Sequence, residues 1–232
     1  MASTESPLLK VYHKLYEAFG PQHWWPADSA FEVVIGAILT QNTSWKNVEK
    51  AIGNLKRFPF TTRALCDLEN EVLAERIRSA GYFNVKSRRI KALLGFLIDR
   101  YGGRLEAMRN VPRDILRGEL LSVKGIGPET ADCILLYALQ KPSFVIDAYT
   151  RRIFGRLEVL DDAAPYEDLR EIFEEALPTD VALFNEYHAL IVTLGKDVCR
   201  PKPRCGSCPL AAICPSCNED LAQKEDLIDG KV

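Results

Sequence analysis

The sequence has no long hydrophobic run and no recognisable leader segment. No stretch of about 18 or more apolar residues occurs, so no segment is long enough to cross a bilayer as a helix. The N-terminal residues lack a basic start followed by a continuous apolar stretch, so we expect no signal peptide. We therefore expect a protein of the cytoplasm, or of the nucleus if the cell has one.

Alternation of apolar and polar residues, the mark of a half-buried strand, is also nearly absent. Apolar residues recur at helical spacing instead, as from Phe31 to Leu39. Asp28-Ser29 and Thr179-Asp180 precede apolar runs in the way that helix N-caps do. The 232 residues, 47% apolar and 27% charged, suit a globular protein of one large domain or two small ones. We predict an all-α fold of about ten helices separated by glycine and proline.

The chain carries no net positive charge that would by itself favour an acidic partner, because its formal net charge is −2. Locally the balance differs. Residues 86–117 hold three acidic side chains against nine basic ones, namely Lys86, Arg88, Arg89, Lys91, Arg100, Arg104, Arg109, Arg113 and Arg117. Such a stretch is either a phosphate-facing surface or a solvated helix face balanced by acids elsewhere, and charge alone does not separate the two.

A tight turn is predicted at Lys124-Gly125-Ile126-Gly127-Pro128, between two apolar helical segments. Glycine tolerates the positive φ that such a turn needs, and Pro128 suits the first turn of the following helix. Backbone N–H groups beside a helix N-terminus can bind a DNA phosphate without reading the base sequence. A plain corner between two helices is the alternative, and the full pattern, Lys124 included, favours the phosphate site.

This hairpin and the segment after its second helix resemble the helix-hairpin-helix (HhH-GPD) DNA glycosylases, the superfamily that includes endonuclease III and the adenine and alkylpurine glycosylases. The resemblance covers most of the chain, from about Trp24 to Cys214. It implies that the segment Phe144-Val145-Ile146-Asp147-Ala148 carries the catalytic aspartate, here Asp147. Without the family, Asp147 would be a helix N-cap; the two roles are compatible, since a capping carboxylate is fixed in orientation and ionised.

Bifunctional members of the superfamily use a lysine on the first turn after the hairpin, which forms a Schiff base with the sugar before the strand is cut. Glu129 stands at that position in this sequence. Glutamate cannot form an imine, so the resemblance implies a monofunctional enzyme in which Asp147 and water cleave the N-glycosidic bond and leave an abasic site. Glu129 itself is explained by its favourable place at a helix N-terminus.

The three tryptophans lie in two short segments, His23-Trp24-Trp25-Pro26 and Gln41-Asn42-Thr43-Ser44-Trp45. Flipped bases stack on aromatic side chains, and a cationic alkylated purine gains further from facing indole rings. Ordinary core packing is the alternative for any one of them. The set resembles 3-methyladenine DNA glycosylase III, which implies a base pocket of Trp24, Trp25, Pro26, Gln41 and Trp45, with Lys196 nearby.

Five of the seven cysteines fall within residues 199–217, and four of them have the spacing C-x5-C-x2-C-x5-C: Cys199, Cys205, Cys208 and Cys214. Four thiolates on one loop can hold a zinc ion or a [4Fe–4S] cluster, and a single short loop suits the cluster better. Endonuclease III and the adenine glycosylases carry a similar cluster loop, although this chain has one residue fewer between the first two cysteines. Cys217 is a fifth thiol that could compete. The alkylpurine branch often lacks this loop.

The resemblance implies two interleaved helical domains. A six-helix barrel would span residues 28–141, with the hairpin motif at about 115–139, and residues 1–27 with 142–232 would form the second domain, with the cluster loop at 199–214. The active site is expected in the cleft between them, on a monomer that binds damaged double-stranded DNA at the nucleoid. The alternatives are an oxidised-pyrimidine glycosylase with lyase activity, of the endonuclease III type, and a DNA-damage-binding protein without catalysis.

Overall fold

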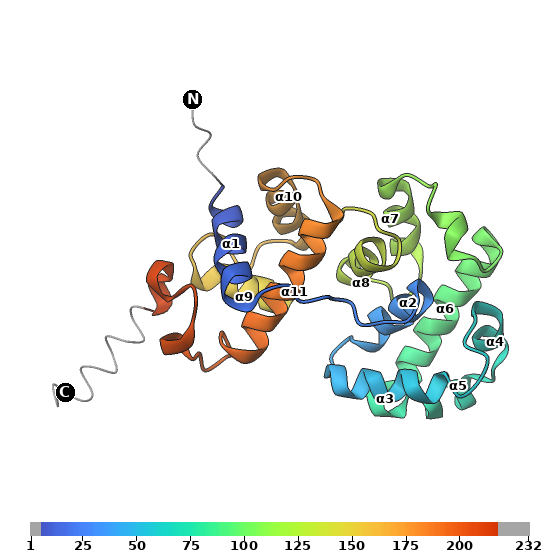
Figure 1. Ribbon diagram of the computed structural model, residues 1–232. Coiled ribbons are helices and arrows are strands. Elements are labelled where there is room, and N and C mark those ends of the chain that lie inside the picture. Colours follow the sequence, from blue (N-terminus) through green and yellow to red (C-terminus); the bar gives the residue numbers. More distant parts are fainter. Residues whose placement is uncertain (1–5, 218–232) are drawn as a thin grey trace. The chain divides into compact units, whose positions relative to one another are not determined.

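The computed structural model describes residues 6–217, and this part of the chain is helical with no strand (Figure 1). The predicted all-α class is therefore confirmed. None of the helices in the described part is both long and apolar enough to cross a membrane. The expected caps are also found: the Ser29 side chain accepts a hydrogen bond from the Glu32 N–H, and that of Asp180 accepts one from the Leu183 N–H. Each cap stabilises its helix by about 1 kcal/mol.

The chain divides into two compact units. One unit is continuous and comprises residues 25–143. The other joins the N-terminal residues, up to Trp24, to everything from Phe144 onward, and the structure describes it over 6–24 and 144–217. From the sequence we expected the continuous domain to span residues 28–141. We call them the hairpin unit (25–143) and the terminal unit (6–24 with 144–217), and each has its own core.

The hairpin unit is built around α2 and α6. Its helices are α2 (Ala30–Leu39), α3 (Trp45–Leu55), α4 (Thr62–Asp67), α5 (Asn70–Arg76), α6 (Phe83–Tyr101), α7 (Arg113–Ser122) and α8 (Pro128–Cys133), with short 3-10 turns at Arg78–Ala80 and Leu105–Met108. Residues 134–138 continue α8 in π-helical geometry, and all five are buried. The long helix α6 packs against α4 and α5, whereas α2 packs against the π-helical segment and is buried along most of its length.

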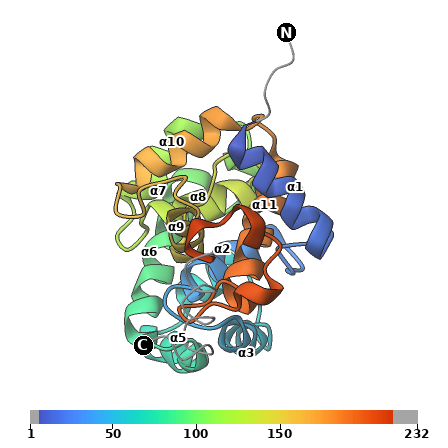
Figure 2. The ribbon, with the colours of Figure 1, turned by 90° about the vertical axis from the view of Figure 1, so that its left-hand side faces the viewer.

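The terminal unit comprises α1 (Pro7–Phe19), α9 (Ala148–Arg156), α10 (Tyr166–Ala176) and α11 (Val181–Asp197). Figures 1 and 2 both show α1 beside α11, and α11 also packs along α9. Its core is aromatic: the rings of Phe144 and Phe173 stack with centroids 4.2 Å apart, and Phe184 and Tyr187 meet Phe144 edge-on. The buried Tyr187 hydroxyl donates to the Leu8 carbonyl at 2.6 Å, which ties α1 to α11.

Candidate active site

Asp147 is the N-cap of α9. Its backbone is extended, and its Oδ1 accepts hydrogen bonds from the Thr150 N–H at 2.7 Å and the Thr150 hydroxyl at 2.9 Å. Burial raises the pKa of this carboxyl, but hydrogen bonding and charge at His188, together with the two Thr150 donors, outweigh burial and lower it below the ordinary value. Asp147 is therefore a nearly buried carboxylate that is held ionised and in one orientation.

His188 is the residue at this site that sequence reasoning missed. It lies on α11, is 5% exposed, and places its Nε2 3.5 Å from Oδ2 of Asp147. The two residues are 41 positions apart, and nothing in the local pattern around His188 connects them. The only available signal was a histidine within an otherwise apolar helical stretch, which more often marks core packing than function.

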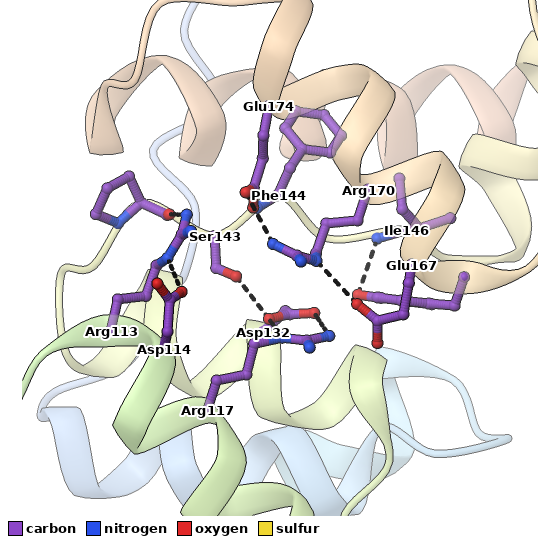
Figure 3. A network of polar contacts seen from close by, with 12 residues as sticks. Arg113, Asp114, Arg117, Asp132, Ser143, Phe144, Ile146, Glu167, Arg170 and Glu174 are labelled. Carbon is purple, nitrogen blue, oxygen red and sulfur yellow. Dashed lines mark hydrogen bonds and ion pairs between the residues drawn. The ribbon is translucent and has the colours of Figure 1, made fainter.

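The extended segment that leads to Asp147 is fixed within the terminal unit by two side chains (Figure 3). Glu174 accepts a hydrogen bond from the Phe144 N–H at 3.0 Å, and Arg170 donates to the other oxygen of Glu174 at 2.8 Å. The Ile146 N–H donates to the Tyr166 hydroxyl at 3.3 Å. These contacts hold the backbone immediately before the cap, so they add to the fixed position of Asp147.

Three of the predicted pocket residues meet in the hairpin unit. Trp25, Pro26 and Trp45 line one cavity of about 230 Å³. The rings of Trp25 and Trp45 are edge-to-face with centroids 5.4 Å apart, and Trp25 packs closely on α2, because a Cβ at Gly36 would lie only 3.1 Å from its ring. The remaining lining residues are Glu32, Gly36, Glu49, Ile52, Gly53 and Lys56, and Glu49 accepts a hydrogen bond from the Trp45 indole at 2.9 Å.

The other three predicted pocket residues do not line this cavity. Trp24 belongs to the terminal unit and directly follows His23, whose φ of 52° is unusual for a residue other than glycine. Lys196 is exposed on the last turn of α11. Gln41, expected near the flipped base, instead bonds to the hairpin: its amide donates to the Thr130 hydroxyl at 2.9 Å and to the Gly125 carbonyl at 3.4 Å, and its oxygen accepts from Arg89.

The hairpin has the predicted turn. Gly125 has a φ of +92°, Gly127 is the N-cap of α8 and Pro128 occupies the first helical turn. The Arg89 side chain lies where a Cβ at Gly125 would be, so only glycine fits there. Lys124 and Gly127 are exposed. Ile126 differs from the expectation: its side chain is buried and its N–H donates to the Val123 carbonyl at 3.0 Å, so it closes the turn and does not face a ligand.

Of the two interpretations of the basic stretch 86–117, a phosphate-facing surface and a solvated helix face, neither holds for two of its lysines. Lys86 is 1% exposed, and its ammonium group donates to the carbonyls of Leu39 at 2.9 Å and Ala80 at 2.8 Å. The ammonium group of Lys91 donates to the carbonyls of Cys66 and Leu68. Both lysines satisfy the carbonyl ends of short helical segments, where a cation is favourable, and neither is free to bind phosphate.

Tyr82 is an exposed aromatic residue that the sequence pattern did not single out. Tyr82 is the N-cap of α6, is 71% exposed, and has a φ of 45°. Positive φ is uncommon for a bulky residue, and strained residues concentrate at functional sites.

The four spaced cysteines follow α11 on one loop, and none of the four forms a disulfide. Burial raises the pKa of the Cys208 thiol, the Leu210 N–H opposes this, and the charges of Cys199, Cys214 and Cys205 raise it further. The Cys199 sulfur accepts from the Arg156 guanidinium at 3.3 Å. The soft donors and these hydrogen bonds fit a metal-bound thiolate set. As the side chains stand, however, no three His, Cys, Asp or Glu residues within 6–217 are grouped closely enough to hold a metal ion.

A helical fold with a glycine hairpin and an oriented N-cap aspartate defines a DNA-binding protein of the helix-hairpin-helix class. Residues 35–179 match the family model of the HhH-GPD superfamily base excision DNA repair proteins. A provisionally named DNA repair glycosylase of Methanocaldococcus jannaschii is 49% identical over 89% of this chain and 95% of its own length. The endonuclease III of Thermotoga maritima is 31% identical over 79% of this chain and 82% of its own.

Two solved structures are similar as well. An endonuclease III–DNA complex has a TM-score of 0.80 over 93% of this chain and 97% of that chain, and at 24% identity the likeness concerns the fold. The H. pylori 3-methyladenine DNA glycosylase bound to 1,N6-ethenoadenine has a TM-score of 0.69 at 29% identity, over 82% of this chain and 95% of that chain. The chain belongs to the HhH-GPD superfamily of base excision repair proteins and is a DNA N-glycosylase.

Proposed function

We propose that this glycosylase is monofunctional and cleaves the bond between the deoxyribose and a flipped damaged base, with an alkylated purine as the favoured substrate. The observation that carries the proposal is the Asp147 carboxylate, which is nearly buried, held ionised and fixed at the start of α9. Cleavage of the N-glycosidic bond builds positive charge on the sugar. A fixed carboxylate stabilises that charge and orients or deprotonates the attacking water.

The choice of water as nucleophile rests on the first turn of α8. Glu129 occupies the position where bifunctional relatives would carry the lysine, and it lies in the first turn directly after Pro128. A carboxylate cannot form a Schiff base with the sugar. The product is therefore an intact strand with an abasic site.

The preference for alkylated purines is supported by the cavity of Trp25, Pro26 and Trp45. Two indole rings beside a cavity of about 230 Å³ suit a flat base, and their electron-rich faces favour a cationic one. The H. pylori relative, bound to an ethenoadenine, is 29% identical to this chain. Trp24 and Lys196 remain candidates for contact with the flipped base, and Gln41 for the gap that the base leaves.

The DNA-binding surface would centre on the hairpin. The exposed residues Lys124 and Gly127 and the half-buried Gly125 lie beside the N-terminus of α8, which suits a phosphate. Tyr82 has the exposure of an aromatic wedge that enters between base pairs while a nucleotide is flipped. The protein would act as a monomer on duplex DNA, in the cytoplasm at the nucleoid.

Cys199, Cys205, Cys208 and Cys214 would hold a [4Fe–4S] cluster, with zinc as the alternative. When bound, such a group supplies four metal–sulfur bonds that order the loop after α11. Arg156 would then stabilise the Cys199 thiolate, and the loop would present Lys202 and Arg204 to DNA phosphates. Cys217 is 1% exposed and is a spare thiol.

The test is base release from duplexes containing 3-methyladenine, 7-methylguanine, hypoxanthine, thymine glycol or a mismatch, under single-turnover conditions with borohydride present. We expect release of an alkylated purine without a trapped covalent adduct. Asp147→Asn should lower the rate by about 10² to 10⁴ and leave DNA affinity unchanged. Asp180→Asn is the matched control, because it also changes a helix-capping aspartate and lies away from Asp147 along the chain.

Three outcomes would overturn parts of this proposal. Thymine glycol release with an efficiently trapped adduct would show an enzyme of the endonuclease III type. Unchanged turnover in Asp147→Asn would remove the catalytic role of Asp147. DNA binding without release of any base in the panel would leave a damage-binding protein.

A further inference from the structure

The two carboxylate oxygens of Asp147 have different surroundings. Oδ1 accepts both Thr150 hydrogen bonds, at 2.7 and 2.9 Å, and is thereby committed to capping α9. Oδ2 faces the imidazole of His188 at 3.5 Å. Since the capping geometry fixes one oxygen, the second is the one available for chemistry at the sugar. The group that faces Oδ2 therefore controls the direction in which this oxygen points toward the sugar.

The position of His188 is fixed by the packing of α11. Its neighbour Tyr187 is fully buried and anchored to Leu8 of α1. Further along, α11 approaches α9 so closely that the Tyr149 ring lies where a Cβ at Gly195 would be. Arg152 of α9 donates to the Gly195 carbonyl at 2.9 Å and to the Cys199 carbonyl at 2.9 Å. α9 and the C-terminal end of α11 therefore cannot separate without breaking these contacts.

We infer that His188 is a positioning residue for base excision, which orients the reactive oxygen of Asp147 by donating a hydrogen bond from Nε2. The inference rests on the proposed role of Asp147. His188 is not a catalytic residue in this scheme, because it acts through the carboxylate. The donor is present both in the neutral Nε2–H tautomer and in the imidazolium form, so the interaction does not require a charged histidine.

The distance of 3.5 Å is longer than an ordinary N–H···O bond of roughly 2.7 to 3.2 Å. Such bonds at active sites are often long without substrate and shorten when the reacting complex forms. The distance between Nε2 and Oδ2 needs to fall by only about 0.3 Å, from 3.5 Å, to reach this range. The groups that act on the pKa of Asp147 besides burial are His188 from α11 and Thr150 from α9, and all favour the ionised form.

Two substitutions of His188 distinguish a role as hydrogen-bond donor from a role in packing alone. His188→Gln keeps an N–H near the position of Nε2, whereas His188→Leu fills similar space without a donor. Thr193→Val is the matched control, since it removes a different hydrogen bond from the same helix, the one from the Thr193 hydroxyl to Gln22 at 2.7 Å. Single-turnover rate constants, DNA dissociation constants and melting temperatures are measured for all variants on the duplex that the wild type cleaves best.

We expect His188→Leu to lower the single-turnover rate by roughly 10- to 100-fold, as a misplaced catalytic group does, with DNA affinity unchanged. The single-turnover rate of His188→Gln should stay within about threefold of the wild-type rate, and that of Thr193→Val should equal the wild-type rate. The acid limb of the rate profile should move to higher pH in His188→Leu, because the pKa of Asp147 rises when its hydrogen-bond donor is lost. Equal losses in the leucine and glutamine variants, or an unmoved acid limb, would overturn the inference.

A spectroscopic readout covers the case in which His188→Leu does not fold. The Nε2–H proton of His188 is followed by ¹⁵N-edited NMR in the wild type and in Asp147→Asn, a substitution that preserves helix capping. We expect this resonance to move upfield in Asp147→Asn, and an unchanged resonance would overturn the inference. If Asp147→Asn remains fully active, the proposed function itself fails. If it is inactive while His188→Leu is as active as the wild type, only the role of His188 fails.

Discussion

The buried ammonium group of Lys86 shows how a single residue is held against the cost of desolvation. Its two acceptors, the carbonyls of Leu39 and Ala80, end α2 and the 3-10 turn before α6, where the backbone dipoles favour a cation. Burial nevertheless lowers the pKa of Lys86 to about 8, and the nearby Arg89 charge adds to this effect. The lysine thus contributes two hydrogen bonds, but its charged form is less stable in the folded protein than in water.

This pKa predicts how stability depends on pH. Between pH 8 and the unfolded value near 10.5 the unfolded chain binds more protons at Lys86 than the folded one, so its contribution to the free energy of unfolding rises with pH across that window. From about pH 7.5 to about pH 9.5, the wild type should gain roughly 1 to 2 kcal/mol relative to Lys86→Met. Chemical denaturation at the two pH values measures the difference. Lys91→Met, a half-buried lysine on the same helix, is the control, and parallel curves for the wild type and Lys86→Met would contradict the prediction.

At the residue scale, the sequence was most informative where a residue type is tied to backbone geometry. Gly125 and the Asp147 cap were predictable because a tight turn needs positive φ and a helix start needs an acceptor. His188 and Lys86 were not, because their roles depend on partners 41 and 47 positions away, respectively. The pattern around a basic residue does not tell whether its side chain faces water or donates to the carbonyl groups at the end of a distant helix.

At the scale of elements, the hairpin is held by a buried ion pair (Figure 3). Arg117 of α7 donates to both oxygens of Asp132 of α8, at 2.8 and 3.0 Å, and the Ser143 hydroxyl donates to the same carboxylate at 2.6 Å. Asp132 is fully buried. The two helices that flank the turn therefore keep a fixed spacing, and the end of the hairpin unit is fastened to α8. An aspartate directly before the apolar residues 133–139 was the sequence signal for this pair.

Breaking this pair should be costly. Asp132→Ala leaves the Arg117 charge without its buried partner and should lower the free energy of unfolding by roughly 3 to 5 kcal/mol. Asp114→Ala removes an exposed pair with Arg113 and should cost less than about 1 kcal/mol. The combination Arg117→Met with Asp132→Leu should recover most of the loss, because no charge then stays buried. Urea denaturation of the three variants is the measurement, and equal losses in the two single variants would contradict the expected difference.

The helical class and the hairpin followed from periodicity and from glycine and proline, which act over a few residues. The base pocket did not follow in the same way. Trp25 and Trp45 meet because Gly36 lets an indole lie on α2, which is a property of packing between elements. Gln41 belongs to the same predicted set, yet it turns to the hairpin because the Thr130 hydroxyl and the Gly125 carbonyl offer it two acceptors.

At the scale of the whole molecule, the chain has two cores, and the cysteine loop belongs to only one of them. Arg156, at the C-terminal end of α9, donates to the Cys199 sulfur and to the carbonyls of Arg200 at 2.7 Å and Pro201 at 3.0 Å. The Cys214 thiol lies 3.5 Å from the Arg156 carbonyl. The loop is thus attached to the rest of the terminal unit through α9, the helix that Asp147 caps. An ordered loop would stabilise that unit and would have little effect on the core around α2 and α6.

Metal content and metal removal test this arrangement together. Anaerobically purified protein should contain about four iron atoms per chain and absorb visible light as a [4Fe–4S] protein does. A colourless protein with one zinc per chain would show that the four cysteines bind zinc and not a [4Fe–4S] cluster. After removal of the metal, hydrogen exchange followed by mass spectrometry should show faster exchange in α9 and at the C-terminal end of α11, because the loop that Arg156 binds is no longer ordered. Peptides from α2 to α8 should keep their protection, since their core is separate. Equal loss of protection in both units would show that the loop supports the whole fold.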